Sequence, residues 1–291
     1  MNDHSEAIGI HRFPLGRRAI MGSGLVTGLT LAAVGAEAQA VHTDSTGVVA
    51  GDIQVPSYGG NIPAYFARPD KEGSFPIVLL IEAVSGIDDY LKDVCRRFAK
   101  AGYLAIVPEV YVRQGDLSKM TDIPQIVSQV ISKTPDAQIM GDLDAAAAWA
   151  AQNHGDVTKL AVTGFCRGGR GVWLYAAHNP QLKAAVAWYG VLGGSTSDIQ
   201  PKTALDLADQ LQCPLLGLYG GKDASIPVDQ VRTAEARAKA AGKTVEIVIY
   251  PEAGHAFHSD TRPSYNREAA EDGWRRTLAW FGKYGVAPTT G

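Results

Sequence analysis

One short stretch, TGFCRGG at residues 163–169, constrains the fold of this chain more than any other. The apolar run before it, residues 159–162, predicts a β-strand, and the run after it, residues 171–177, predicts a buried helix. A strand, a tight turn bracketed by glycines and a helix are typical of a nucleophile elbow, whose central residue has a strained backbone. Glycine is expected at 164 and 168 because a side chain there would collide with the neighbouring strand or helix.

The central residue of this turn is Cys166. At the N-terminus of a helix, unpaired N–H groups favour a thiolate, which is the reactive form of cysteine. A cysteine after a strand is also compatible with a small buried apolar residue. Whether Cys166 is a nucleophile therefore depends on the partners that the rest of the chain supplies.

Composition excludes several classes of protein. The 291 residues are 46% hydrophobic, enough for a sizeable core, and the net charge of −3 gives no argument for nucleic acid or for an anionic membrane surface. The three cysteines, Cys95, Cys166 and Cys213, are too few and too scattered for a disulfide framework or a zinc site. We expect neither a metal nor a cofactor.

The first forty residues are predicted to be an export signal rather than part of the fold. Arg17-Arg18 precedes an apolar, glycine-rich run at 19–34, and Ala38-Gln39-Ala40 is typical of a cleavage site. This pattern indicates a twin-arginine signal read by the twin-arginine export machinery, and a periplasmic or secreted protein cut near Ala40. Gly16 and Gly22 depart from the usual signal. A retained membrane anchor is the alternative, although the run is short for a span, and a cytoplasmic protein is another.

Strands and helices alternate along residues 41–291. An antiparallel hairpin is predicted from runs at 48–56 and 62–69. Further strands are predicted at 76–81, 103–107, 159–162, 184–189, 214–219 and 245–250, and helices at 88–101, 136–153, 171–177, 227–241 and 265–284; residues 115–135 are ambiguous, with a short helix at 123–132. This order predicts one α/β domain with a doubly wound, mostly parallel sheet and an N-terminal antiparallel hairpin.

Two loops that follow predicted strands carry the partners that a thiol nucleophile needs, namely a base and an acid that orients it. Asp223 follows the strand ending at 219, although it could also be a helix cap. His255 lies after a glycine in the loop that follows the last strand, and His258 is a weaker candidate for base or for a substrate contact. The order nucleophile, acid, base is that of the α/β-hydrolase fold.

Other candidate residues also follow strands. Glu82 comes directly after a buried strand and Arg113 follows the next one, so we expect the two to pair across the pocket, with a structural salt bridge as the alternative. An oxyanion hole is expected from the backbone N–H groups of Ala83 and Arg167.

Together, the stretches GFCRGG at 164–169, IE at 81–82, PEVYVRQ at 108–114, GKD at 221–223 and GHAF at 254–257 resemble the dienelactone hydrolase family, the carboxymethylenebutenolidases. The resemblance spans residues 51–282. It implies a triad of Cys166, His255 and Asp223. It also implies that Glu82 helps to activate the thiol and that Arg113 contacts a substrate carboxylate. We further expect Tyr111 and His258 to contact the substrate.

The chain departs from the family after the histidine, where no second arginine occurs before Arg262. We therefore expect hydrolysis of an ester or lactone through an acyl-thioester, without committing to dienelactone. A broad carboxylesterase or thioesterase is one alternative. A non-catalytic α/β-hydrolase-fold protein that binds a small molecule or a partner is the other.

Overall fold

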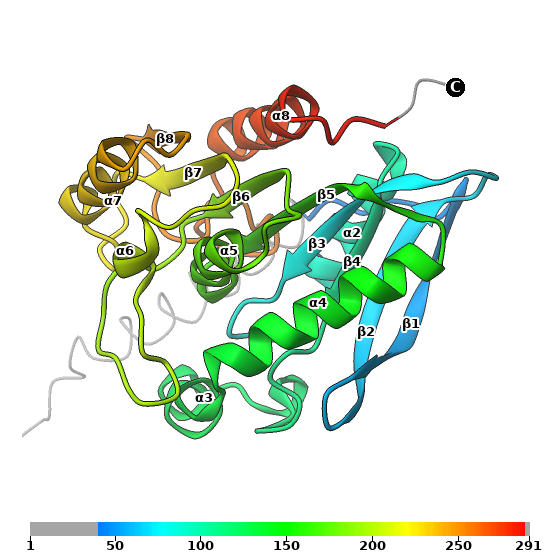
Figure 1. The fold of residues 1–291 in the computed structure, drawn as a ribbon, viewed down its shortest axis with the longest axis horizontal. Helices are drawn as coiled ribbons and strands as arrows, with labels where there is room; N and C mark the ends of the chain where they lie inside the picture. Colours follow the sequence, from blue (N-terminus) through cyan, green and yellow to red (C-terminus); the bar gives the residue numbers. More distant parts are fainter. Residues whose placement is uncertain (1–39, 289–291) are drawn as a thin grey trace, which may run out of the picture.

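A single eight-stranded sheet, with helices on both faces, organises the molecule in the computed structural model, which describes residues 40–288 (Figure 1). All seven residues of β3 (Phe75–Ile81) are buried, and this explains its place in the middle of the sheet. The order is β1-β2-β4-β3-β5-β6-β7-β8. The predicted export signal lies outside the described residues except for Ala40.

Strands β1 (Val48–Ser57) and β2 (Gly60–Pro69) form the antiparallel hairpin, and β2 also pairs antiparallel with β4 (Leu104–Pro108). The other pairings are parallel. The remaining strands are β5 (Gly155–Phe165), β6 (Ala184–Trp188), β7 (Leu215–Gly220) and β8 (Val245–Tyr250). Because the parallel strands share one direction, the loops after β3, β5, β6, β7 and β8 meet at one edge of the sheet.

Helices cover the two faces in separate groups. Helices α2 (Asp89–Lys100) and α8 (Arg267–Lys283) lie on one face, where Phe98 contacts Trp274 and Phe281. The other face carries α4 (Asp136–Gln152), α5 (Arg167–His178), α6 (Ala204–Leu207) and α7 (Val228–Ala240), each in contact with the next (Figure 1). A short α3 (Ile123–Gln129) lies between two 3-10 turns, η1 (Leu117–Lys119) and η2 (Ile131–Lys133).

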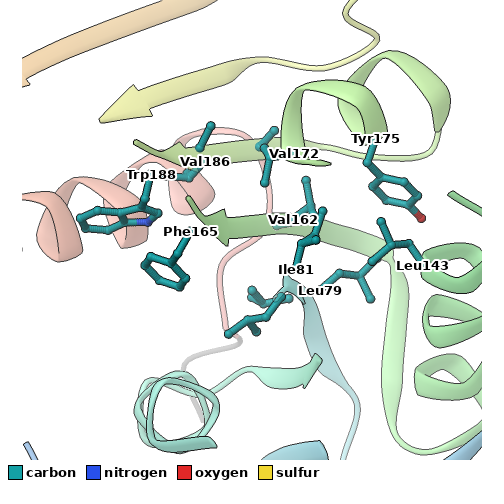
Figure 2. Packing of buried hydrophobic residues seen from close by; sticks show 14 of the residues in the cluster. Leu79, Ile81, Leu143, Val162, Phe165, Val172, Tyr175, Val186 and Trp188 are labelled. Carbon is teal, nitrogen blue, oxygen red and sulfur yellow. The ribbon is translucent and has the colours of Figure 1, made fainter. Parts of the chain in front are cut away.

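The core fills both faces of the central strands. Figure 2 shows Leu79 and Ile81 of β3 beside Val162 of β5, with side chains of α4 and α5 packed over them. Phe165 and Trp188, at the ends of β5 and β6, are buried and their rings lie 5.6 Å apart. The strand ends that carry the candidate site therefore rest on close-packed apolar side chains.

The predicted α/β-hydrolase fold is confirmed, including the hairpin and the mostly parallel sheet. Some boundaries were wrong: β5 begins at Gly155 rather than residue 159, and α6 was not predicted. The start of β5 was not predicted because it contains polar residues such as Asp156 and Thr158. The pairing of β5 with β3 is irregular there. Among residues 40–288, no helix is both long and apolar enough to cross a membrane.

The glycines of the elbow are required by packing. An ideal Cβ at Gly168 would lie 2.1 Å from the carbonyl oxygen of Ile81, and one at Gly164 would lie 2.6 Å from the carbonyl oxygen of Gly168. These contacts press the first turn of α5 against the ends of β3 and β5. The elbow can approach the sheet this closely only because both positions lack a side chain.

We predict that Gly168→Ala lowers the free energy of unfolding by about 3 kcal/mol or more, because backbone rather than a flexible side chain occupies the space. Gly141→Ala is the matched control, since that exposed glycine of α4 has no atom within 4 Å of an ideal Cβ. It should raise stability by up to about 1 kcal/mol through helix propensity. Urea unfolding measures both, and equal effects of the two variants would contradict this account.

Candidate active site

Cys166 occupies the strained position at the junction of β5 and α5. Its φ of 56° and ψ of −115° are unusual for a residue with a side chain. The strain is held from two sides, because its N–H donates to the carbonyl of Trp188 at 3.1 Å and its own carbonyl accepts from Arg170 N at 3.2 Å. The turn thus has the geometry that the sequence predicts for a nucleophile elbow.

His255 and Asp223 meet at the ends of β8 and β7. His255 Nδ1 lies 2.6 Å from Asp223 Oδ2, and Asp223 Oδ1 accepts from the N–H and the hydroxyl of Ser225 at 2.9 and 2.6 Å. An ionised carboxylate only accepts hydrogen bonds, so Nδ1 is the donor and the Nε2 side of the ring is left for other partners. Asp223 therefore fixes both the orientation and the tautomer of the imidazole.

The charges of these two residues support each other. Burial raises the pKa of Asp223, but hydrogen bonds from His255 and Ser225 outweigh it and hold the pKa below its ordinary value. Burial likewise lowers the pKa of His255, yet the bond to Asp223 and the nearby Cys166 raise it to about 10. At neutral pH the imidazole therefore carries a proton that it can donate.

A cavity of about 270 Å³ opens above Cys166 and His255. Most of its lining is apolar or aromatic, and it comprises Ala83, Val84, Ser85, Asp88, Tyr90, Leu91, Ile123, Phe165, Cys166, Tyr189, His255, Ala256, Ser259 and Arg262. Among residues 40–288, four non-glycine residues have positive φ, and three of them, Cys166, Tyr189 and Ala256, line this cavity. Backbone strain is therefore concentrated here, as is typical of functional sites.

The two backbone groups expected to form an oxyanion hole lie at the same corner. Ala83 lines the cavity, two residues after the end of β3, and Arg167 is the first residue of α5. The close approach of Gly168 to the carbonyls of Ile81 and Glu82 brings these two segments together beside Cys166. Two N–H groups from different segments can then stabilise a single negative oxygen.

The predicted pair of Glu82 and Arg113 is wrong. Arg113 makes a bidentate ion pair with Asp142 at 2.7 and 3.0 Å and donates to the carbonyl of Tyr58 at 2.8 Å. The reason is that Asp142 of α4 and the turn between β1 and β2 present oxygen acceptors to the guanidinium. Arg113 is not among the residues that line the cavity.

Glu82 is buried outside the cavity lining, beside Glu109 and Leu117. One of its oxygens accepts weakly from Tyr111 N at 3.4 Å. Burial and the neighbouring Glu109 raise the pKa of Glu82 well above its ordinary range. Burial therefore favours the neutral carboxyl, whereas the partner of an arginine that the sequence predicts would be ionised.

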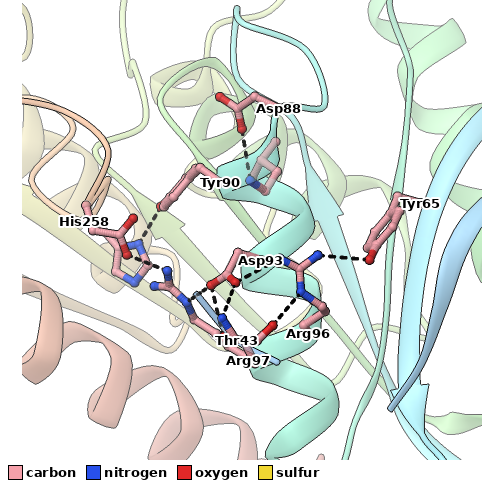
Figure 3. A network of polar contacts seen from close by, with 10 residues as sticks. Thr43, Tyr65, Asp88, Tyr90, Asp93, Arg96, Arg97 and His258 are labelled. Carbon is pink, nitrogen blue, oxygen red and sulfur yellow. Dashed lines mark hydrogen bonds and ion pairs between the residues drawn. The ribbon is translucent and has the colours of Figure 1, made fainter. Parts of the chain in front are cut away.

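Tyr111 and His258, the other predicted substrate contacts, also lie outside the lining. His258 is buried against Phe165 and Trp188, and its Nδ1 lies 2.5 Å from the hydroxyl of Tyr90 (Figure 3). Burial, with help from Arg97, lowers the pKa of His258 to about 3, so the ring is neutral. His258 therefore contacts the cavity indirectly, through the lining residues Tyr90 and Phe165.

Arg262 was missed as a site residue. It is exposed at the cavity, near Asp88, and lies seven residues after His255. Its distance from His255 along the sequence gives no sign of a shared site. The turns that follow His255 return the chain to the cavity. Within residues 40–288, no group of three His, Cys, Asp or Glu side chains is arranged to hold a metal ion.

Comparison with known proteins gives a consistent result. The profile described as "Dienelactone hydrolase family" matches residues 62–285. A "Putative carboxymethylenebutenolidase" of Methylorubrum extorquens is 52% identical over 94% of both chains, and one of Escherichia coli is 52% identical over 84% of this chain and 91% of its own. A crystal structure described as a "Putative Dienelactone Hydrolase" from Klebsiella pneumoniae superposes with a TM-score of 0.80 at 54% identity, covering 81% of this chain and 99% of that one.

We predict that Asp223→Asn lowers the pKa of His255 from about 10 toward its ordinary value, because a neutral amide stabilises the imidazolium far less than a carboxylate does. The histidine then loses its proton at lower pH. NMR titration of the His255 ring measures this change. Glu252→Gln is the control, because that exposed carboxylate of the same loop pairs with Lys222 instead. An unchanged midpoint in Asp223→Asn would contradict the assignment.

Proposed function

Because the chain belongs to the dienelactone hydrolase family, we propose that it hydrolyses a carboxylic ester or lactone with Cys166 as the nucleophile and His255 and Asp223 as its partners. The observation that carries this proposal is the His255–Asp223 hydrogen bond beside a strained cysteine in one cavity. A non-catalytic binding protein has no need for backbone strain and an oriented imidazolium at the same point.

In the proposed reaction, Cys166 Sγ, as the thiolate, attacks the carbonyl carbon and the π electrons move to the oxygen. The N–H groups of Ala83 and Arg167 stabilise that oxyanion. Collapse breaks the bond to the leaving oxygen, which takes the proton from His255 Nε2, and a thioester remains. Water then attacks the thioester as His255 accepts its proton, and the acid product leaves with the thiolate restored.

The test of this mechanism is Cys166→Ala, which should reduce turnover of a small activated ester at least about 10³-fold while the protein stays folded. Cys166→Ser should retain weak activity, because an alcohol is harder to ionise than a thiol. Cys213→Ala, a buried cysteine outside the cavity, is the matched control and should remain active. Full activity in Cys166→Ala, with folding checked by circular dichroism, would rule out the thioester route.

Arg262 is the group that we propose for recognition of a substrate carboxylate, in place of Arg113. It is the only arginine or lysine that lines the cavity within the described part of the chain, and it makes no ion pair within 4 Å there. Arg113, by contrast, is already neutralised by Asp142. A guanidinium that keeps its donors free can bind an anionic group without first breaking a buried pair.

We predict that Arg262→Leu lowers kcat/KM for an ester with a free carboxylate about tenfold more than for its neutral methyl-ester counterpart. Arg113→Leu is the control and should affect both substrates alike, since its guanidinium pairs outside the cavity. Steady-state kinetics on the matched substrates decide the matter. Equal losses on both in Arg262→Leu would favour a broad carboxylesterase without an anion site.

A further inference from the structure

A segment that we call the lid, residues 116–134, connects β4 to α4 and borders the cavity. It holds η1, α3 and η2. Its inner side is apolar: Leu117, Ile126, Val130 and Ile131 are buried. Helix α3 has only seven residues, and helices this short depend on tertiary contacts for their stability. The position of α3 is therefore set by whatever anchors the lid.

The outer side of α3 is also apolar. Ile123 and Val127, one helical turn apart on the same side, are 47% and 43% exposed. Ile123 lines the cavity that contains Cys166 and His255. A substrate chain that extends out of the cavity would therefore contact an apolar surface, the exposed side chain of Ile123.

One glutamine ties the far end of the lid to the loop between β6 and α6, residues 191–203, which we call the strap. Gln200 of the strap donates through Nε2 to the carbonyls of Ile131 and Thr134 at 2.7 and 2.8 Å. In Figure 1 the strap runs beside α3. Both N–H groups of the amide donate to carbonyls of the lid, so this end of the lid is held by two hydrogen bonds.

The remaining atom of that amide is held by the residue after the nucleophile. Arg167 donates from a guanidinium nitrogen to Gln200 Oε1 at 2.9 Å. A rotated amide would place its own donors against the guanidinium, so this bond fixes the amide orientation. One continuous path thus runs from the first residue of α5 through Gln200 to the lid.

We propose that Arg167 and Gln200 are positioning residues that hold the lid so that Ile123 selects substrates with an apolar acyl chain. The proposal rests on the hydrolase function proposed above and adds a substrate class to it. Arg170 supports the same arrangement nearby, since it pairs with Asp136 at the start of α4 and with the carbonyl of Lys202 in the strap.

The test compares p-nitrophenyl butanoate with p-nitrophenyl acetate, which share a leaving group and differ by two methylenes. The quantity measured is the ratio of kcat/KM for butanoate to that for acetate. Ile123→Ser, Gln200→Leu and Arg167→Leu should each lower this ratio about fivefold, since a methylene in an apolar pocket contributes a factor on the order of ten. The ratio cancels any effect on the oxyanion hole, because both substrates use it.

Two controls separate the lid from general surface effects. Val157→Ser removes an apolar side chain of similar exposure, 45%, outside the cavity lining, and Gln210→Leu removes an exposed glutamine bonded to the carbonyl of Asp206. Both should leave the ratio unchanged. The Arg167→Leu/Gln200→Leu double variant should lose no more than either single variant, because the two residues act through one path.

A loss in Ile123→Ser without any loss in Gln200→Leu and Arg167→Leu would overturn the anchoring role. An unchanged ratio in all three variants would overturn the proposal entirely. If the wild type hydrolyses neither ester, the hydrolase function fails instead. The ratio of the rates at which N-hexylmaleimide and N-ethylmaleimide alkylate Cys166 then measures the same selectivity without turnover. Cys95 and Cys213 do not interfere, because both are buried. The three variants should lower that ratio too, and no change would refute the lid's role.

Discussion

The close contact between the first turn of α5 and the end of β3 is the constraint on which the site depends. With a hypothetical Cβ of Gly168 only 2.1 Å from the Ile81 carbonyl, the two segments touch through bare backbone. That contact adjoins the strained Cys166 and holds the start of α5 close to the segment that leads to Ala83, and both Cys166 and Ala83 line the cavity. A bulkier residue would separate these groups even if every catalytic side chain were kept.

Charge around the cysteine is divided between ionised and neutral groups. The hydrogen bond between His255 and Asp223 favours the charged form of each, whereas burial disfavours the charged forms of Glu82 and His258. The resemblance to the family implies a glutamate–arginine pair that prepares the thiol. Here the hydrogen bond to Asp223 and the neighbouring Cys166 raise the pKa of His255 without that pair, so the proposed activation of the thiol does not require a substrate carboxylate.

The fold and the acid–base pair could be predicted because strand ends in a parallel sheet meet at one edge. The meeting of Asp223 and His255 could be predicted from that rule and from their positions after β7 and β8. The partner of Arg113 could not be predicted, since it depends on which side of α4 faces the β1–β2 turn. Arg262 and Gln200 lie in irregular loops without periodicity, where only the folded path of the chain shows which groups they reach.

The order of the proposed triad along the chain has a consequence for biosynthesis. His255 follows β8, the last strand, and is made about 90 residues after Cys166. At roughly 5–20 residues per second, several seconds pass between the two. Until His255 is made, the cysteine lacks its proposed imidazolium partner, even after the Asp223 carboxylate has been made. Under the proposed mechanism, Cys166 gains its complete acid–base partner only when the final strand joins the sheet.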